Sequence, residues 1–477
     1  MRLLDDKRKV KTVRVLVYPN ITYQKDLSKD SYIQVIKQQI SLLNEIRDDL
    51  WFYVILPTRR RSKNNPNGSF ETLLDFPNVK QWYITIPKYP PAMRSHFNVC
   101  NMQKMLDKGL DFDLVMSHLP EHTHALENTM YNLTHHVPPV FGYCHWFDLK
   151  NVVTWSKDSF LQNVTGLLEM DRCYLNTQHQ KDMVLNQARE TFNDDTIDRL
   201  NNILEVQHLG VYREDIVSNI NDKPEKVIVF NHRPDTYKHF NQFIAVTDKL
   251  WKMRQDFTVW VPLLDAGNHD EENRFREYVD VKKSDNTVSK KMNYYNQLKK
   301  CYMGFSPKQK YGGWSVATTD GMMNGVPYIM YDDTYYKELY PHGDFFENDH
   351  EALMLLNTYL DDPKYRNEEA QKALDYMSSS MVYKNEIIKM SEYMDDLLAR
   401  QKVMRATKIL SDTETDKLEK IIEFIKKGAA TKQQIMDYLG WGRGIKWSPY
   451  RRALMNHPNI FDVMDEYPMY IWRDMNG

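Results

Sequence analysis

The chain has 477 residues, a formal net charge of -2 and 42% apolar residues, a length that predicts two or three domains. The four cysteines, Cys100, Cys144, Cys173 and Cys301, have no CxxC spacing, which favours a reducing compartment over a disulfide framework. The sequence contains no run apolar enough to span a bilayer, and its charged start lacks a signal-peptide core. We therefore expect a cytoplasmic protein without a membrane partner.

The N-terminal half alternates apolar runs with helical stretches, a pattern that predicts a parallel sheet. Ser31 and Gln34 form a potential capping box for a helix that extends to Ile46. The expected strands are Thr12–Tyr18, Leu50–Leu56, Trp82–Ile86, Leu114–Ser117 and Pro139–Cys144.

A group of histidines follows the fourth of these strands, and its short spacing invites a metal interpretation. His118, Glu121, His122 and His124 do not form an H-E-x-x-H motif, and the acids of Asp111-Phe-Asp113 precede a strand instead of ending one. We therefore expect no metal site. His118 and Glu121 remain candidates for acceptor binding at a strand end. The alternative is a polar cluster whose members hydrogen-bond one another.

In the second half, the strand-like run Lys226–Phe230 leads directly into two cations, Arg233 and Lys238. Ligands of open parallel sheets bind at the carboxyl ends of the strands. Both cations are therefore expected to neutralise a pyrophosphate and to stabilise it as a leaving group. The alternative is that each is an ordinary solvated charge.

The segment Ser306–Tyr331 combines a glycine turn, a short helix and a buried strand, after an expected strand at Cys301–Phe305. Gly312 and Gly313 allow backbone N–H groups to approach a ligand, and Ser315 can cap the helix that follows Trp314. The free amides of a helix N-terminus attract a diphosphate. Asp320, about a turn and a half into the helix, is placed to accept the hydroxyls of a ribose. The alternative is a glycine turn beside a core helix.

The order of these features resembles the donor half of the GT-B glycosyltransferases, especially retaining family 4. In that family a strand precedes an arginine and a lysine, and PS, EGFG, E and GxPVI follow. Arg233 and Lys238 match the diphosphate-binding pair, Asp320 stands where the second glutamate binds ribose, and Gly325-Val326-Pro327 matches the GxP turn. Gly312 replaces the first glutamate, and Tyr18-Pro-Asn-Ile-Thr22 replaces a glycine-rich loop.

The resemblance covers roughly the first four fifths of the chain and is only architectural in the N-terminal half. It implies that the first domain binds the acceptor and that His145 and Asp148, which follow a strand, lie near the donor sugar. A general-base role for Asp148 would imply inversion, whereas family 4 implies retention without a dedicated base. GT-B enzymes generally use cations in place of a metal, so no cofactor beyond the nucleotide sugar, expected to be a UDP-sugar, is implied.

After a long helical stretch from Lys364 to Met404, a charged linker at 411–415 introduces a separate module. A helix is expected over Asp416–Lys427, a second helix capped by Thr431 with Gln434, and a third beginning near Ser448 and Pro449. The runs Ile460–Met464 and Met469–Trp472 predict a terminal hairpin. This order matches the winged-helix plan.

The tail is locally basic, which predicts that it binds DNA. The alternative is a winged helix that binds protein. The candidate DNA-binding residues are Lys432, Arg443, Lys446, Trp447, Arg451 and Arg452.

Together these features predict an α/β protein of the GT-B class: two Rossmann-like domains facing across a cleft, at 1–205 and 206–410, and a small winged-helix α+β domain at 411–477. The expected activity is transfer of a sugar to hydroxymethylated pyrimidines such as hydroxymethylcytosine in double-stranded phage DNA, in the cytoplasm of the host. Two alternatives are transfer to a glycan or protein, with the tail used for assembly, and a DNA-binding regulator whose body senses a sugar nucleotide. The donor's sugar and nucleobase, the acceptor base and the oligomeric state stay open.

Overall fold

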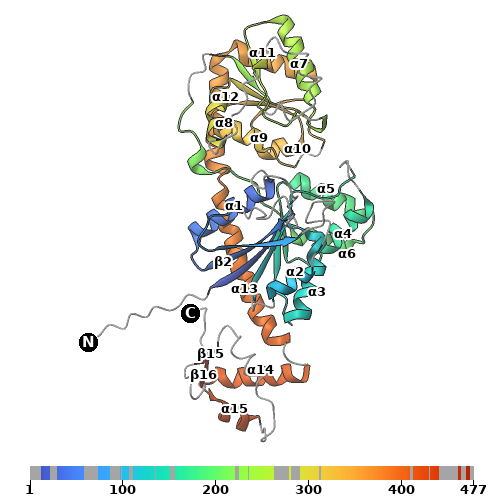
Figure 1. Ribbon diagram of the computed structural model, residues 1–477, viewed down its shortest axis with the longest axis vertical. Helices are drawn as coiled ribbons and strands as arrows, with labels where there is room; N and C mark the ends of the chain where they lie inside the picture. The colour runs from blue at the N-terminus through green and yellow to red at the C-terminus, as the bar shows by residue number, and fades with distance from the viewer. Residues whose placement is uncertain are drawn as a thin grey trace, which may run out of the picture.

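The structure is a computed structural model that describes residues 12–21, 30–58, 73–85, 97, 99–106, 111–134, 136–150, 156–220, 225–234, 236–262, 279–280, 290–310, 313–408, 412–428, 430–439, 460–462 and 469–472 (Figure 1). These residues form two parallel sheets, each covered by helices, and a small antiparallel sheet near the C-terminus. The predicted pair of Rossmann-like domains is therefore confirmed.

The first sheet has seven parallel strands in the order β3-β2-β1-β4-β5-β6-β7. Each expected strand is present, with bounds shifted by a few residues. The strands are β1 (Val13–Tyr18), β2 (Leu50–Thr58), β3 (Val79–Thr85), β4 (Leu114–Ser117), β5 (Val140–Tyr143), β6 (Arg172–Leu175) and β7 (Leu204–Val206).

Among the described residues, one or more helices lie between successive strands of this domain, except between β2 and β3. Asp30 caps α1 by accepting the N–H of Tyr32 at 2.9 Å, so the predicted cap at Ser31 is wrong by one residue. A carboxylate at this position can satisfy a first-turn amide and also complements the helix dipole. The helices are α1 (Ser31–Ile46), α2 (Val99–Leu106), α3 (Thr123–Thr134), α4 (Lys157–Leu167), α5 (Gln178–Arg189) and α6 (Asp194–Ile203).

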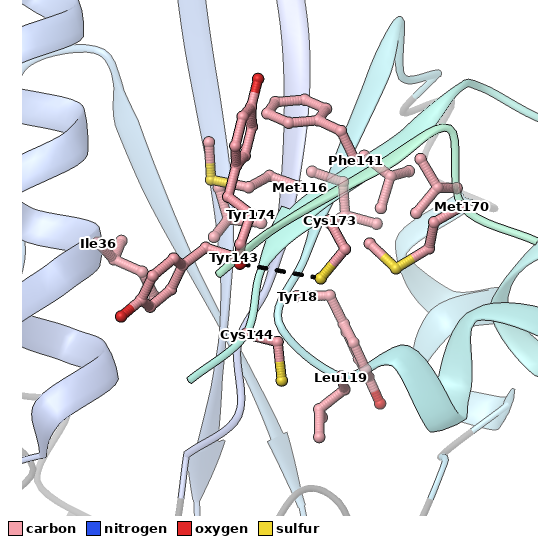
Figure 2. Close-up of a cluster of buried hydrophobic side chains, with 14 of the residues drawn as sticks. Tyr18, Ile36, Met116, Leu119, Phe141, Tyr143, Cys144, Met170, Cys173 and Tyr174 are labelled. Atoms are coloured by element: carbon pink, nitrogen blue, oxygen red, sulfur yellow. Dashed lines mark hydrogen bonds between the residues drawn. The ribbon is translucent and has the colours of Figure 1, made fainter. Parts of the chain in front are cut away.

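The core of the first domain is built from the buried strands and from the helix faces turned toward them. Figure 2 shows part of this core, where Met116 of β4, Phe141 of β5 and Cys173 of β6 lie together with Ile36 of α1. Cys144, Cys173 and Cys301 are free thiols.

The second sheet has six parallel strands in the order β10-β9-β8-β11-β12-β13. Its strands are β8 (Val227–Val229), β9 (Thr258–Trp260), β10 (Val279–Asp280), β11 (Met303–Ser306), β12 (Tyr328–Tyr331) and β13 (Asp344–Phe346). Its helices are α7 (Phe240–Met253), α8 (Lys290–Leu298), α9 (Val316–Met323), α10 (Thr334–Leu339), α11 (Asp349–Asp361) and α12 (Pro363–Ser380).

The long helical stretch predicted from Lys364 consists of two helices, because α12 ends at Ser380 and α13 (Tyr383–Lys408) begins after a short break. At the break, Val211 N–H donates to Met381 O (2.7 Å) and Tyr383 N–H donates to Val211 O (3.1 Å). The chain thus passes between the domains twice, near Val211 and near Met381, and these two segments lie side by side. α13 then returns to the first domain and packs against α1.

The C-terminal part contains α14 (Asp412–Lys426), α15 (Lys432–Tyr438) and an antiparallel sheet of β14 (Ala430–Thr431), β16 (Met469–Trp472) and β15 (Ile460–Asp462). The predicted terminal hairpin is confirmed. The predicted linker is wrong over Asp412–Thr415, which already belongs to α14. The expected third helix lies outside the described residues, so the winged helix and the domain boundaries stay predictions.

Among the described residues, no helix is long and apolar enough to cross a membrane.

Candidate functional site

A crevice is expected where the strand order of the second sheet reverses, between β8 and β11. These two strands pair directly, so their carboxyl ends are neighbours. β8 leads into Asn231, His232 and Arg233, and β11 ends at Ser306. The residues that the sequence singled out for a donor therefore start from the two strands that flank the switch point.

A chain of buried hydroxyl groups joins the end of β11 to the start of α9. Ser315 caps α9 by accepting the N–H of Thr318, as predicted. The Thr318 hydroxyl is 2.6 Å from the Ser315 hydroxyl and 2.7 Å from that of Ser306. His232 Nε2 lies 3.4 Å from the Ser306 hydroxyl, and burial with the nearby Lys238 charge lowers the pKa of His232 to about 3. The imidazole is therefore neutral at pH 7.

The two predicted cations differ in their surroundings. Arg233 is exposed, whereas Lys238, on a short 3-10 turn, is half-buried and donates to Oε1 of Gln309. Gln309 in turn donates to the Tyr336 hydroxyl at 2.6 Å, and burial raises the pKa of Tyr336 to about 12. Lys238 is thus oriented by a chain of side chains, while the Arg233 side chain is exposed to solvent.

Asp320 lies on α9, where the Tyr295 hydroxyl of α8 donates to its Oδ1 at 3.2 Å. Burial and the Asp320 charge together raise the pKa of both Tyr294 and Tyr295, so both phenols stay protonated as donors. Tyr294 also accepts a hydrogen bond from Nδ2 of Asn231 (2.8 Å), which links α8 to the end of β8. The Asp320 carboxylate is therefore held from α8.

Two glycines make room for a tyrosine that supports this corner. The ring of Tyr328 lies so close to Gly304 and Gly321 that an added Cβ would be 2.2 Å and 2.0 Å from ring atoms, respectively. Its hydroxyl donates to Oδ1 of Asn231 at 3.0 Å. Gly321 thus lets α9 approach β12 closely enough for Tyr328 to orient Asn231.

In the first sheet the strand order reverses between β1 and β4, and histidines follow β4 and its neighbour β5. The Tyr32 ring, in the first turn of α1, stacks on His145 with centroids 4.1 Å apart and on His118 with centroids 5.4 Å apart. The Ser31 hydroxyl lies 3.4 Å from Nε2 of His145. The structure therefore brings His118 and His145 together around Tyr32.

In the described part of the chain, both ring nitrogens of His118 and Nδ1 of His145 are buried without a hydrogen-bond partner. Leaving a buried polar group unpaired costs about 1–3 kcal/mol. Burial lowers the pKa of His118 to about 3 and that of His145 to about 4, so both rings are neutral at pH 7.

Asp148 and Glu121 are linked through one amide side chain. Asn163 Oδ1 accepts the N–H of Asp148 at 3.0 Å, and its Nδ2 donates to Oε2 of Glu121 at 3.2 Å. Asp148 is only 3% exposed. This geometry favours the polar-cluster alternative for Glu121, and the role of Asp148 as a base stays a prediction.

The glycine turn before α9 meets the first domain. A Cβ added to Gly313 would lie 3.5 Å from Cδ of Gln180 on α5. The Trp314 ring stacks on His208 with centroids 5.4 Å apart and an interplanar angle of 23°. We call Gly313–Ser315 the donor loop; it is in contact with α5 and with the segment after β7.

Sequence reasoning missed several residues of this site. Asn231 and His232 stand between the predicted strand and Arg233, so their position at a strand end could have marked them as site residues. No short motif in the sequence marks Tyr32 or Tyr295, because their contacts depend on how their helices pack against other elements. Gly312, Arg443, Lys446, Trp447, Arg451 and Arg452 lie outside the described residues, as does the Lys432 side chain. No three His, Cys, Asp or Glu side chains gather as a metal site among the residues described.

No known protein family matches the sequence, and no curated protein is similar to it. Solved structures that share the architecture include Anabaena HepE in complex with UDP-glucose, at 11% identity and a TM-score of 0.57, covering 80% of this chain and 99% of that one. A glycosyltransferase from Rickettsia africae matches at 12% identity and a TM-score of 0.57, covering 81% and 99%. The N-terminal domain of a Candida albicans trehalose-6-phosphate phosphatase matches at 11% identity and a TM-score of 0.56, covering 82% and 98%.

The described residues therefore form a GT-B fold. At these identities the likeness establishes the fold alone, and the activity has to be argued from the site.

Proposed function

We propose that this protein is a glycosyltransferase that moves a sugar from a nucleotide donor, a UDP-sugar, to a hydroxyl group. The observation that carries the proposal is the assembly at the second switch point. There Arg233 and Lys238 follow β8, and the capped α9, which carries Asp320, follows β11, the strand that pairs with β8. Cations and free helix amides suit a diphosphate, and an oriented carboxylate suits ribose hydroxyls.

In this reaction the acceptor oxygen bonds to the anomeric carbon as the bond from that carbon to the diphosphate oxygen breaks. Arg233 and Lys238 stabilise the charge that develops on the diphosphate. The acceptor proton passes to the leaving diphosphate if configuration is retained, or to Asp148 if it is inverted. His145, which is only partly buried, lies on the first-domain side, where a neutral imidazole can hydrogen-bond sugar or acceptor hydroxyls, and the fully buried His118 packs near it around Tyr32.

The acceptor we propose is double-stranded DNA that carries hydroxymethylated pyrimidines, as in phage genomes. This part rests on the tail, where α14, α15 and a terminal antiparallel sheet accompany a locally basic sequence. A tethered DNA-binding module would raise the concentration of duplex near the site. A base inside the duplex is out of reach of such a crevice, so the target nucleotide would be flipped out.

The test is incubation with a panel of radiolabelled UDP-sugars and duplexes that differ only in cytosine or hydroxymethylcytosine. We expect label to enter the hydroxymethylated duplex alone. Label that enters added glycans or proteins in preference to DNA would favour the other acceptor class. Donor binding without turnover on any acceptor would favour a regulator that senses a sugar nucleotide.

A further inference from the structure

A glutamate of the second domain caps a helix of the first. α5 begins after Thr177, whose hydroxyl accepts the N–H of Gln180 at 3.0 Å. The N–H groups of the first two residues, Gln178 and His179, donate instead to the two carboxylate oxygens of Glu338 on α10, each at 2.7 Å. Amides in the first turn of a helix have no partner within the helix. Here the other domain provides it.

The contact is electrostatically favourable, because a helix N-terminus carries a partial positive charge and Glu338 presents both of its oxygens to it. Other contacts extend the same boundary. The His179 ring lies against Tyr335, with centroids 5.9 Å apart, and Gln180 reaches the donor loop at Gly313. The loop is therefore held against the very helix that Glu338 caps.

The position of this contact suits a device that controls domain closure. The chain joins the domains at the double crossover near Val211 and Met381. In Figure 1 the connection between α12 and α13 lies on the side of α1, away from α5 and α10. A contact on the opposite side of the boundary from the crossover limits how far the domains can rotate apart. Loss of such a contact lowers the population of the closed arrangement.

We propose that Glu338 is a positioning residue: by capping α5 across the domain boundary, it keeps the two domains closed and the donor loop seated on the first domain. Its kinetic consequence rests on the proposed function, whereas its structural consequence does not. Glu338 need not touch the substrate, because it acts through α5 and the donor loop.

The test removes the contact from each side in turn. Glu338→Ala deletes the acceptor, and Gln178→Pro deletes one donor while the helix is retained, since proline is well tolerated at the first helical position. The matched controls are Glu368→Ala, an exposed glutamate on α12, and Lys157→Pro, the first residue of α4 after its cap Ser156. Neither control touches the domain boundary contacts described above.

We expect Glu338→Ala to speed hydrogen exchange of the His179 amide and to increase the radius of gyration in X-ray scattering. Gln178→Pro should cause the same expansion, and both controls should match the wild type. In the transfer assay, kcat/KM should fall about tenfold in both boundary variants, while UDP affinity by calorimetry stays within about twofold, because the proposed UDP contacts lie in the second domain.

Wild-type exchange and scattering in both boundary variants would overturn the proposal. Expansion together with lost UDP binding would also overturn it, because Glu338 would then act on the donor site itself. Expansion in a protein whose wild type transfers no sugar would support the cap and contradict the proposed function.

Discussion

Arg233 and Lys238 follow the same strand end but differ in exposure, so we expect their removal to affect turnover equally and stability unequally. Each replacement by Ala should slow sugar transfer by about a hundredfold, the scale of one lost electrostatic contact to a leaving group. Lys238→Ala should in addition free Gln309 and Tyr336, to which Lys238 is linked, and so lower stability slightly. Steady-state kinetics and urea unfolding measure both effects. Lys364→Ala, which changes an exposed residue of α12, is the control, and near-normal turnover in both site variants would remove Arg233 and Lys238 from the mechanism.

Asp320 is held by Tyr295, so its loss should affect binding more than chemistry. Asp320→Asn keeps the shape but halves the acceptor capacity for ribose hydroxyls, and the donor KM should rise about tenfold with kcat changed much less. Tyr295→Phe should shift KM in the same direction by a smaller factor, because it only releases the carboxylate. Calorimetry that finds full UDP affinity in Asp320→Asn would refute the ribose assignment.

The buried neutral ring of His118 should make the stability of the folded protein depend on pH. Its folded pKa, about 3, lies below the ordinary value near 6.5, so the unfolded chain takes up the proton first. The contribution of His118 to stability is therefore complete above pH 6.5 and falls as the pH is lowered toward 3, by about 1.4 kcal/mol per pH unit. His118→Phe should reduce this slope and raise stability at pH 5.

Urea unfolding at pH 7 and pH 5 measures that effect, with exposed His350→Gln as the control. An unchanged pH slope in His118→Phe would contradict the buried neutral ring. The same variant separates structure from function: if His118 binds a ligand hydroxyl, turnover falls although stability does not.

At the scale of elements, the position of α9 depends on one missing methyl group. Gly321→Ala would place Cβ 2.0 Å from the Tyr328 ring, so α9 has to move away from β12. Overpacking of this kind costs about 1–3 kcal/mol. The shift also displaces Asn231 and Asp320, so UDP affinity should fall with stability. Thermal unfolding and calorimetry check both, and Gly428→Ala, where no atom lies within 4 Å of the added Cβ, should behave as wild type.

At the scale of the whole molecule, we expect the two α/β domains to bind the nucleotide sugar and the tail to bind DNA. Removal of the chain from Ser411 onward should leave UDP affinity intact, because the proposed donor groups all precede it, and should weaken duplex binding. Arg451→Ala with Arg452→Ala should weaken it more mildly and reduce the salt dependence, since each phosphate contact contributes a slope near one. Filter binding across a salt series measures this. Equal affinity and slope in full-length and truncated protein would favour a protein-binding tail.

The sequence by itself determined the fold class and the strand ends at which the candidate donor residues lie. Alternating apolar runs specify parallel strands, and such strands place whatever follows them at one edge, so Arg233, Lys238 and the Ser315 cap could be located without coordinates. Local signals were also enough for α1 and the terminal hairpin, apart from the cap at Asp30 and the helical residues 412–415.

Only the tertiary structure decided which distant residues meet. Tyr32 lies between His118 and His145, Tyr295 holds Asp320, α13 returns to the first domain, and Glu338 caps α5. Short-range patterns in the sequence indicate where helices and strands form. They do not indicate which residues far apart in the sequence, such as Gln178 and Glu338, come into contact. Those contacts depend on how whole elements pack, and packing is decided by the shape and burial of many side chains at once.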